Sequence, residues 1–349
     1  MAVTTDSTIT RIGADTREYF FGTLIDQVFD RIPLIYKLRR MKRVIVRGGR
    51  ELKWPVSYGK NTQSQIYEPG DPLYASTETK RTLATAGWTY MTIPIMYDVE
   101  DEVANDGNEV ITDTIKAEVS SAQESFMDQL SQTFYGNYGV LDSTTVSAPT
   151  TGKPYSIPSA LWFYTNGGTG ATNFDGGLDT YGGITRSAVG DWWLGNTGTA
   201  PTHYAQTEVD VSPETWDYAV LSCMKKRGSR SNLLAVCGPT LWAKWKSWAR
   251  TENRGNEQKG MLAKVGFTAF TIDDIELVLD DNCPDNYFYM LDLSTWKWFI
   301  NARRNFKMTP FVWQAQTANG ADEYLARILL AHNLVCTKPC NNYFTANMV

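Results

Sequence analysis

The residue types that most often carry enzymatic chemistry are sparse in this chain. Its 349 residues include only two histidines, His203 and His332, which lie far apart and in different contexts. A zinc site built from three histidines is therefore excluded, and a catalytic triad would need one of these two by chance. Carboxylates are plentiful but scattered, so no catalytic pair can be chosen from them. We predict neither an enzymatic activity nor a bound metal or cofactor.

The cysteines form no metal-binding pattern. There are five of them, Cys223, Cys237, Cys283, Cys336 and Cys340, and none belongs to a CxxC pair. The last two lack companion ligands at zinc-finger spacing. The N-terminal residues contain no apolar signal segment and the cysteine count is odd, so we expect free thiols in a reducing compartment.

A glycine-rich region, residues 137–206, could suggest phosphate binding. It contains no GxxxxGK[ST] motif and no convincing strand–GxGxxG–helix context, so we interpret it as a structural loop. Within it, residues 181–187 (YGGITRS) and 191–193 (DWW) form a compact, distinctive cluster.

The overall composition is that of an ordered globular protein. Hydrophobic residues make up 42% of the chain and charged residues 20%. The net charge of −5 argues against a dedicated nucleic-acid binder, and no apolar run approaches the ~18 residues that span a bilayer. The 12 tryptophans fit either large packing surfaces or contacts between subunits.

The element that organises the rest is a helix predicted over residues 108–135. Its apolar residues recur at steps of three or four, which places them on one stripe, and polar residues fill the other faces. The stripe consists of Ile111, Ile115, Val119, Ala122, Phe126, Leu130 and Phe134. Asn108 can cap the first turn and Gly136 can end the helix. At about 1.5 Å per residue the helix would be roughly 40 Å long, which suits a beam that other elements pack against.

Residues 44–97 predict a long two-stranded projection. Strand-like runs lie at both ends, Pro55 favours an edge position, and the polar, turn-rich middle cannot supply a core. An isolated hairpin is marginal in water, so we expect this one to lie on another copy of the chain. Before it, residues 19–36 predict a short amphipathic helix that Pro33 breaks.

Charge is segregated between two neighbouring segments. Residues 37–60 contain nine lysines and arginines against one acid, Glu51, whereas residues 98–128 contain ten acids against one base, Lys116. A solvated helix face would explain the acids, but complementary blocks of this kind also register association between molecules.

The remaining chain alternates helices and strands. Ser212-Pro213-Glu214 starts a helix, and residues 240–250 predict another, with Trp242, Trp245 and Trp248 interleaved with bases. That interleaving could bind nucleic acid, but three tryptophans at helical spacing favour packing. Strands are predicted at 233–237, within 267–279, at 287–293 and at 325–335.

In order and spacing, these features resemble the major capsid proteins of tailed bacteriophages, which share the Hong Kong 97-type fold with encapsulins. The Glu68-Pro69-Gly70-Asp71-Pro72 tip is similar to the family's Glu-Gly loop tip. Residues 181–188 and Trp192-Trp193 resemble the Gly-Gly-Ile-Asp-Arg-Ser…Trp-Trp signature, with Thr185 in place of the usual Asp. The ending, residues 332–339, resembles the family's closing strand.

The resemblance implies an α+β subunit. Its parts would be an N-terminal arm (1–43), an extended β-hairpin loop (44–97), a peripheral domain with the spine helix 108–135 (98–211), an axial domain (212–300) and returning C-terminal strands (301–349). It implies a shell of hexamers and pentamers around double-stranded DNA, assembled in the host cytoplasm with a scaffolding protein and a portal, and with room for a cement protein. The scaffold would be separate or already removed. No membrane is implied.

We hypothesise that basic residues near the base of the loop meet the acidic start of a neighbour's spine helix. The basic set is Arg43, Arg47, Arg50 and Lys53, and the acidic set is Asp101, Glu102, Asp106 and Glu109. The alternatives are an encapsulin-like compartment of the same fold, which holds a protein cargo, and a tryptophan-rich carbohydrate-binding or hydrolytic protein, which would be a compact monomer.

Overall fold

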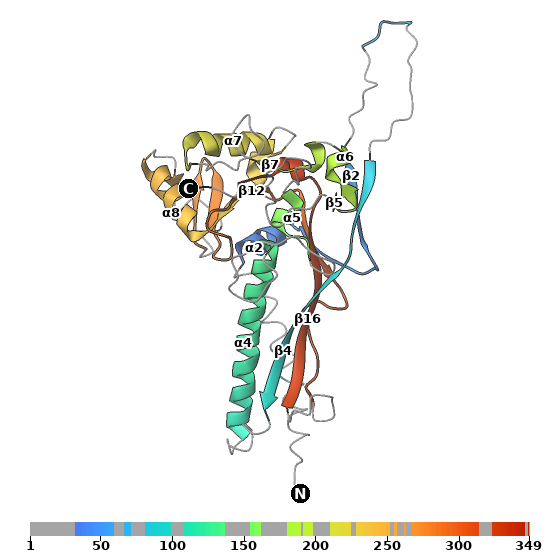
Figure 1. Cartoon of the computed structure of the whole chain (residues 1–349), viewed down its shortest axis with the longest axis vertical. Helices are drawn as coiled ribbons and strands as arrows, with labels where there is room; N and C mark the ends of the chain where they lie inside the picture. Colours follow the sequence, from blue (N-terminus) through green and yellow to red (C-terminus); the bar gives the residue numbers. More distant parts are fainter. Residues whose placement is uncertain are drawn as a thin grey trace, which may run out of the picture.

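The structure is a computed structural model. It describes residues 32–58, 66–70, 81–98, 108–136, 154–161, 180–189, 191–197, 210–224, 228–251, 255–256, 262, 267–313, 323–345 and 348. Two sheets dominate it, and one long helix, α4 (Asn108–Phe134), runs beside the first of them (Figure 1).

A six-stranded sheet packs against α4. Its strands are β1 (Val44–Arg47), β4 (Thr89–Asp98), β13 (Trp296–Asn301), β14 (Lys307–Met308), β15 (Val312–Trp313) and β16 (Glu323–Cys336). The central strand β16 pairs antiparallel with β4 along ten residues, and with β13, β14 and β15 in turn. Met91 and Ile95 of β4 are buried, whereas Tyr90 and Met96 are exposed. The sheet therefore has one face toward the helix and one facing away.

The predicted spine helix is confirmed. The residues of the predicted apolar stripe that are buried are Val119, Phe126, Leu130 and Phe134, and Ala122 is half-buried. The side chains of Ile111 and Ile115 lie outside the described residues. Phe134 meets the ring of Trp298 of β13 edge-on, with the ring centres 5.9 Å apart. Gly136, with a positive φ of 82°, follows the end of the helix as expected.

A seven-stranded sheet forms the second layer. In spatial order its strands are β7 (Asn196–Thr197), β17 (Tyr343–Thr345), β12 (Phe288–Asp292), β8 (Leu233–Cys237), β11 (Ile275–Leu279), β10 (Ala269–Ile272) and β9 (Gly255–Asn256). Helices α7 (Pro213–Met224) and α8 (Pro239–Thr251) pack on it (Figure 1). The backbone N–H of Thr215 donates to Ser212 Oγ at 3.2 Å, which confirms the expected cap.

The tryptophans of α8 pack, as their helical spacing predicts. Trp245 is fully buried, and its ring centre lies 5.3 Å from those of Trp216 and Phe288. Trp242 and Trp248 are half-buried beside it. These rings belong to the core under α7 and α8 and are not presented as a stacking platform.

One prediction about the N-terminal elements is wrong. The projecting hairpin is shorter than residues 44–97, because β1 pairs parallel with β13 and β4 pairs with β16 in the main sheet. Among the described residues between 44 and 97, only β2 (Leu52–Ser57) and β3 (Arg81–Ala86) form the separate two-stranded sheet. Helix α2 (Pro33–Arg40) begins at Pro33, where a first-turn proline has no N–H to leave unpaired, and Ile32 before it is extended. That Pro33 interrupts the helix predicted over residues 19–36 stays a prediction. The rest of the predicted helix, residues 19–31, lies outside the described residues.

The remaining described elements are short. They are α5 (Ile157–Leu161), β5 (Thr180–Tyr181), β6 (Ile184–Thr185), α6 (Arg186–Val189), η1 (Asp191–Trp193), η2 (Arg230–Asn232) and η3 (Pro339–Asn341). Lys37 of α2 forms an ion pair with Glu276 of β11, and Glu276 also accepts the N–H of Leu262 at 3.0 Å. None of the helices described is both long and apolar enough to cross a membrane.

Candidate intersubunit surfaces

The tip of the hairpin exposes apolar side chains. Ile66 is fully exposed and Tyr67 is 58% exposed, and Glu68 beside them is exposed too. Figure 1 shows the described tip segment (blue, at the top) standing well away from both sheets. Exposed apolar residues grouped on a projection indicate a contact with another molecule.

The predicted basic residues differ in their exposure to solvent. Arg47, Arg50 and Lys53 are exposed, and the Lys53 ammonium lies 3.5 Å from the Glu51 carboxylate. Arg43 is half-buried, and its Nε is buried without a hydrogen-bond partner among the described residues. Three of the four bases are therefore available at the surface, and Arg43 is less so.

The predicted acidic partners are barely covered by the structure. Asp101, Glu102 and Asp106 lie outside the described residues. Glu109 belongs to the first turn of α4, but its side chain is not among those described. The proposed contact between the two sets therefore stays a prediction. Farther along α4, Glu118 and Glu124 can be placed: both are exposed, and Glu124 also lines a cavity.

The fold adds basic residues that the sequence pattern does not reveal. Because β1 lies parallel to β13, Arg47 pairs with Asn301, and the turn after Asn301 carries Arg303 and Arg304. The Arg304 guanidinium lies 5.0 Å from the centre of the Tyr90 ring. Segments about 250 residues apart are thus joined into one basic surface. The parallel pairing of β1 is what brings them together, and no local motif signals it.

This surface continues down the face of the six-stranded sheet that turns away from α4. Residues that face each other across strands lie on the same side of a sheet. Lys307 pairs with Leu329, Arg327 with Pro94, and Leu325 with both Met96 and Val312. We call this the outer stripe, and its exposed members include Tyr90, Pro94, Met96, Arg304, Lys307, Val312 and Arg327. It combines apolar with basic side chains.

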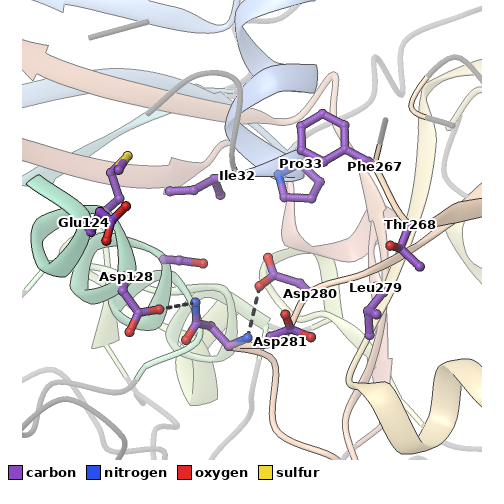
Figure 2. A pocket seen from close by; sticks show the side chains of 12 residues that line it. Ile32, Pro33, Glu124, Asp128, Phe267, Thr268, Leu279, Asp280 and Asp281 are labelled. Atoms are coloured by element: carbon purple, nitrogen blue, oxygen red, sulfur yellow. Dashed lines mark hydrogen bonds between the residues drawn. The ribbon is translucent and has the colours of Figure 1, made fainter. Parts of the chain in front are cut away.

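A cavity of about 350 Å³ lies between α4, the start of α2 and the turn after β11 (Figure 2). Four carboxylates line it, those of Glu124, Asp128, Asp280 and Asp281, together with apolar residues such as Phe267. Among the described residues, no group of three or more possible ligands is arranged to hold a metal ion.

The polar groups at this cavity join the helix to the seven-stranded sheet. Asn282 Nδ2 donates to Asp128 at 2.9 Å, and the Tyr135 hydroxyl donates to Asp280 at 2.7 Å. Burial raises the pKa of the Asp280 carboxyl and raises the pKa of Tyr135 well above its usual value. The arrangement is a structural junction between α4 and the turn after β11.

The cysteine thiols are also buried. All five cysteines are buried and free. Burial raises the pKa of the Cys336 thiol to about 12, so the nucleophilic thiolate is not populated at neutral pH.

Comparison with known proteins identifies the fold. Neither protein-family models nor curated protein sequences give a match. Solved structures do. The capsid asymmetric unit of cyanophage A-1(L) matches with a TM-score of 0.55 and 14% identity over 88% of this chain and 90% of that one. The capsid of a native GTA particle matches at 0.53 and 12% over 90% of each chain. A Gordonia phage Cozz chain matches at 0.53 and 10% over 89% and 86%.

The chain therefore has the Hong Kong 97-type capsid fold of tailed phages, as the sequence resemblance predicted. At these identities the likeness concerns the fold, and the residues that make contacts have to be argued from this chain itself.

Proposed function

We propose that this protein is a major capsid protein whose copies assemble into an icosahedral shell around the double-stranded DNA of a tailed phage. One observation carries the proposal: a capsid fold extends over about nine tenths of the chain in the matches to the cyanophage and GTA capsids. The protein would act structurally, without catalysis. Its division into arm, loop, peripheral domain, axial domain and C-terminal strands is part of the proposal.

Charge supports one orientation of the subunit in the shell wall. The exposed side chains of α4 include Glu118 and Glu124, whereas the outer stripe on the face of the sheet away from α4 carries Arg304, Lys307 and Arg327. A basic inner wall would bind the packaged duplex, and an acidic one would not. We infer that α4 faces the DNA and that the outer stripe faces outward.

The hairpin would bind a neighbouring copy in two places. Its tip, with Ile66, Tyr67 and Glu68, matches the mixture of apolar and basic groups on a neighbour's outer stripe. Its root, with Arg47, Arg50 and Lys53, would meet the acidic start of a neighbour's spine helix. Single surface ion pairs are worth only ~0–1 kcal/mol, but a closed lattice repeats them at every subunit.

The other partners follow from the same proposal. They are further copies in hexamers and pentamers, a scaffolding protein, a portal and optionally a cement protein. The shell would assemble in the host cytoplasm and become the virion capsid.

Size-exclusion chromatography and electron microscopy of the expressed full chain test the function. Closed particles of megadalton mass are expected, whereas a compact monomer under all assembly conditions would contradict it. The encapsulin-like alternative is separated by particle contents: particles recovered from infected cells should contain double-stranded DNA, and a bound protein cargo in place of DNA would favour the alternative.

A further inference from the structure

The root of the projecting hairpin is held by a segment that is distant in sequence. This segment comprises β5, β6, α6 and η1, residues 180–189 and 191–193, and we call it the clamp. It coincides with the YGGITRS and WW cluster noted in the sequence. Its residues include no histidine, cysteine or lysine, so its chemistry suits a structural role better than a catalytic one.

The clamp touches the hairpin through a glycine turn. The backbone N–H of Thr85 in β3 donates to the carbonyl of Gly182 at 2.8 Å. Gly182 has a φ of 62°, and a Cβ placed there would lie 3.0 Å from Ala84 Cβ and 3.1 Å from the Trp54 ring. The left-handed backbone and the close approach both require glycine at position 182.

A second contact lies farther out on the hairpin. The ring of Tyr58, just beyond the end of β2, stacks on Trp192 with centroids 4.9 Å apart and planes 22° apart. Tyr58 is 39% exposed, so this contact lies at the surface. The hairpin is thus held at two separated points, which fixes its direction as well as its position.

The clamp itself is anchored in the core. The buried Tyr181 hydroxyl accepts the N–H of Cys336 at 2.7 Å, and Trp193 Nε1 donates to the Tyr181 carbonyl at 3.0 Å. Arg186 is buried and donates through Nη2 to the carbonyls of Ser159 and Ala160 at 3.0 and 2.5 Å. These bonds join the clamp to β16 and α5, so it cannot shift without disturbing the body of the subunit.

We propose that the clamp positions the hairpin and thereby selects where the tip meets a neighbouring copy. A two-stranded ribbon has little stability of its own, and a small rotation at its root becomes a large displacement at its tip. Gly182 and Trp192 are then positioning residues for assembly. This inference rests on the proposed capsid function.

The test compares an alanine substitution at Gly182, where space is tight, with one at Gly87, where space is open. Gly182→Ala introduces the clash with Ala84 and Trp54, whereas a Cβ at Gly87, between β3 and β4, would have nothing within 4 Å. We expect Gly182→Ala to lower the yield of closed particles per folded subunit at least tenfold, with open or irregular assemblies instead. Gly87→Ala should assemble like the wild type. Adding Ala84→Gly to Gly182→Ala removes one clashing Cβ and should restore part of the yield.

Tyr58→Ala keeps the inference testable if Gly182→Ala fails to fold. Its side chain is at the surface, so the melting temperature should stay within a few degrees while limited proteolysis of the hairpin becomes faster and particle yield falls. Normal closed particles from both Gly182→Ala and Tyr58→Ala would overturn the inference. Failure of the wild type and of Gly87→Ala to form particles would instead refute the proposed function.

Discussion

The indole Nε1 of Trp298 donates a hydrogen bond to Nδ1 of His332, at 3.3 Å, inside the core between α4 and the six-stranded sheet. The Phe134 ring stands perpendicular to the imidazole, with the ring centres 6.3 Å apart. His332 Nε2 is buried and has no hydrogen-bond partner among the described residues. This histidine is therefore a neutral core residue that holds the end of the spine helix against β13 and β16.

Burial lowers the pKa of His332 to about 4. The unfolded chain takes up this proton near pH 6.5, so between pH 6.5 and 4 the unfolded state binds more protons than the folded state. Stability should fall as the pH falls through this window, by at most about 3 kcal/mol. Calorimetry of unassembled protein should show this loss of stability. The stability of the His332→Gln variant should depend less on pH over this window than that of the wild type. Equal pH dependence in both proteins would contradict the role of His332.

Reversing the exposed bases at the hairpin root should block assembly without unfolding the subunit. Arg47→Glu with Arg50→Glu leaves the core untouched, because both side chains are exposed. The double variant should keep the wild-type melting temperature within a few degrees and form few particles in sedimentation assays. Adding Asp101→Lys and Glu102→Lys should restore assembly if these acids are the partners. Normal particles from the double variant would contradict the proposed contact between the hairpin root and a neighbour's spine helix.

The hairpin tip offers a separate test of the apolar contact. Replacing Ile66 and Tyr67 with serine removes exposed apolar surface, so folding should be unaffected and particle yield should fall several-fold. The matched change on the receiving face is Met96→Ser with Val312→Ser, which should give the same defect. A defect in only one of the two pairs would show that the tip binds elsewhere.

Arg186 should be worth far more to stability than a surface arginine with similar bonds. Arg186→Met leaves two buried carbonyls without their charged donor, which should cost about 3 kcal/mol. Arg230 also donates to a backbone carbonyl, that of Asp273, but it is exposed, so Arg230→Met should cost under about 1 kcal/mol. Denaturant unfolding of unassembled protein measures both, and equal costs would contradict the role given to Arg186.

Regular elements whose pattern is local can be predicted from the sequence. The apolar stripe from Val119 to Phe134 predicts α4 to within a residue of its end, because helical spacing alone decides which side chains share a face. The cap at Ser212 is an equally local signal, since its hydroxyl bonds a backbone N–H only three residues away. The buried strand β8 is another, because its five residues are all apolar and Gly238 follows directly.

What the sequence does not reveal depends on contacts between distant segments. The run Val44–Arg47 has the pattern of a strand whichever strand it pairs with, so the pattern cannot predict its parallel pairing with β13. Arg304 comes near Tyr90 because both segments meet β16: Tyr90 pairs with Ala331, whose N–H donates to the carbonyl of Arg304, and no local pattern joins those residues. The requirement for glycine at position 182 is likewise invisible in the sequence, because the side chains that impose it come from β2 and β3.

The central claim is that copies of this chain close into a shell, and electron microscopy of the purified full-length protein tests it most directly. We expect closed icosahedral particles whose wall is one subunit thick, with α4 on the inner side and the outer stripe on the outer side. A protein that stays monomeric under all assembly conditions, or particles with α4 on the outside, would contradict the claim.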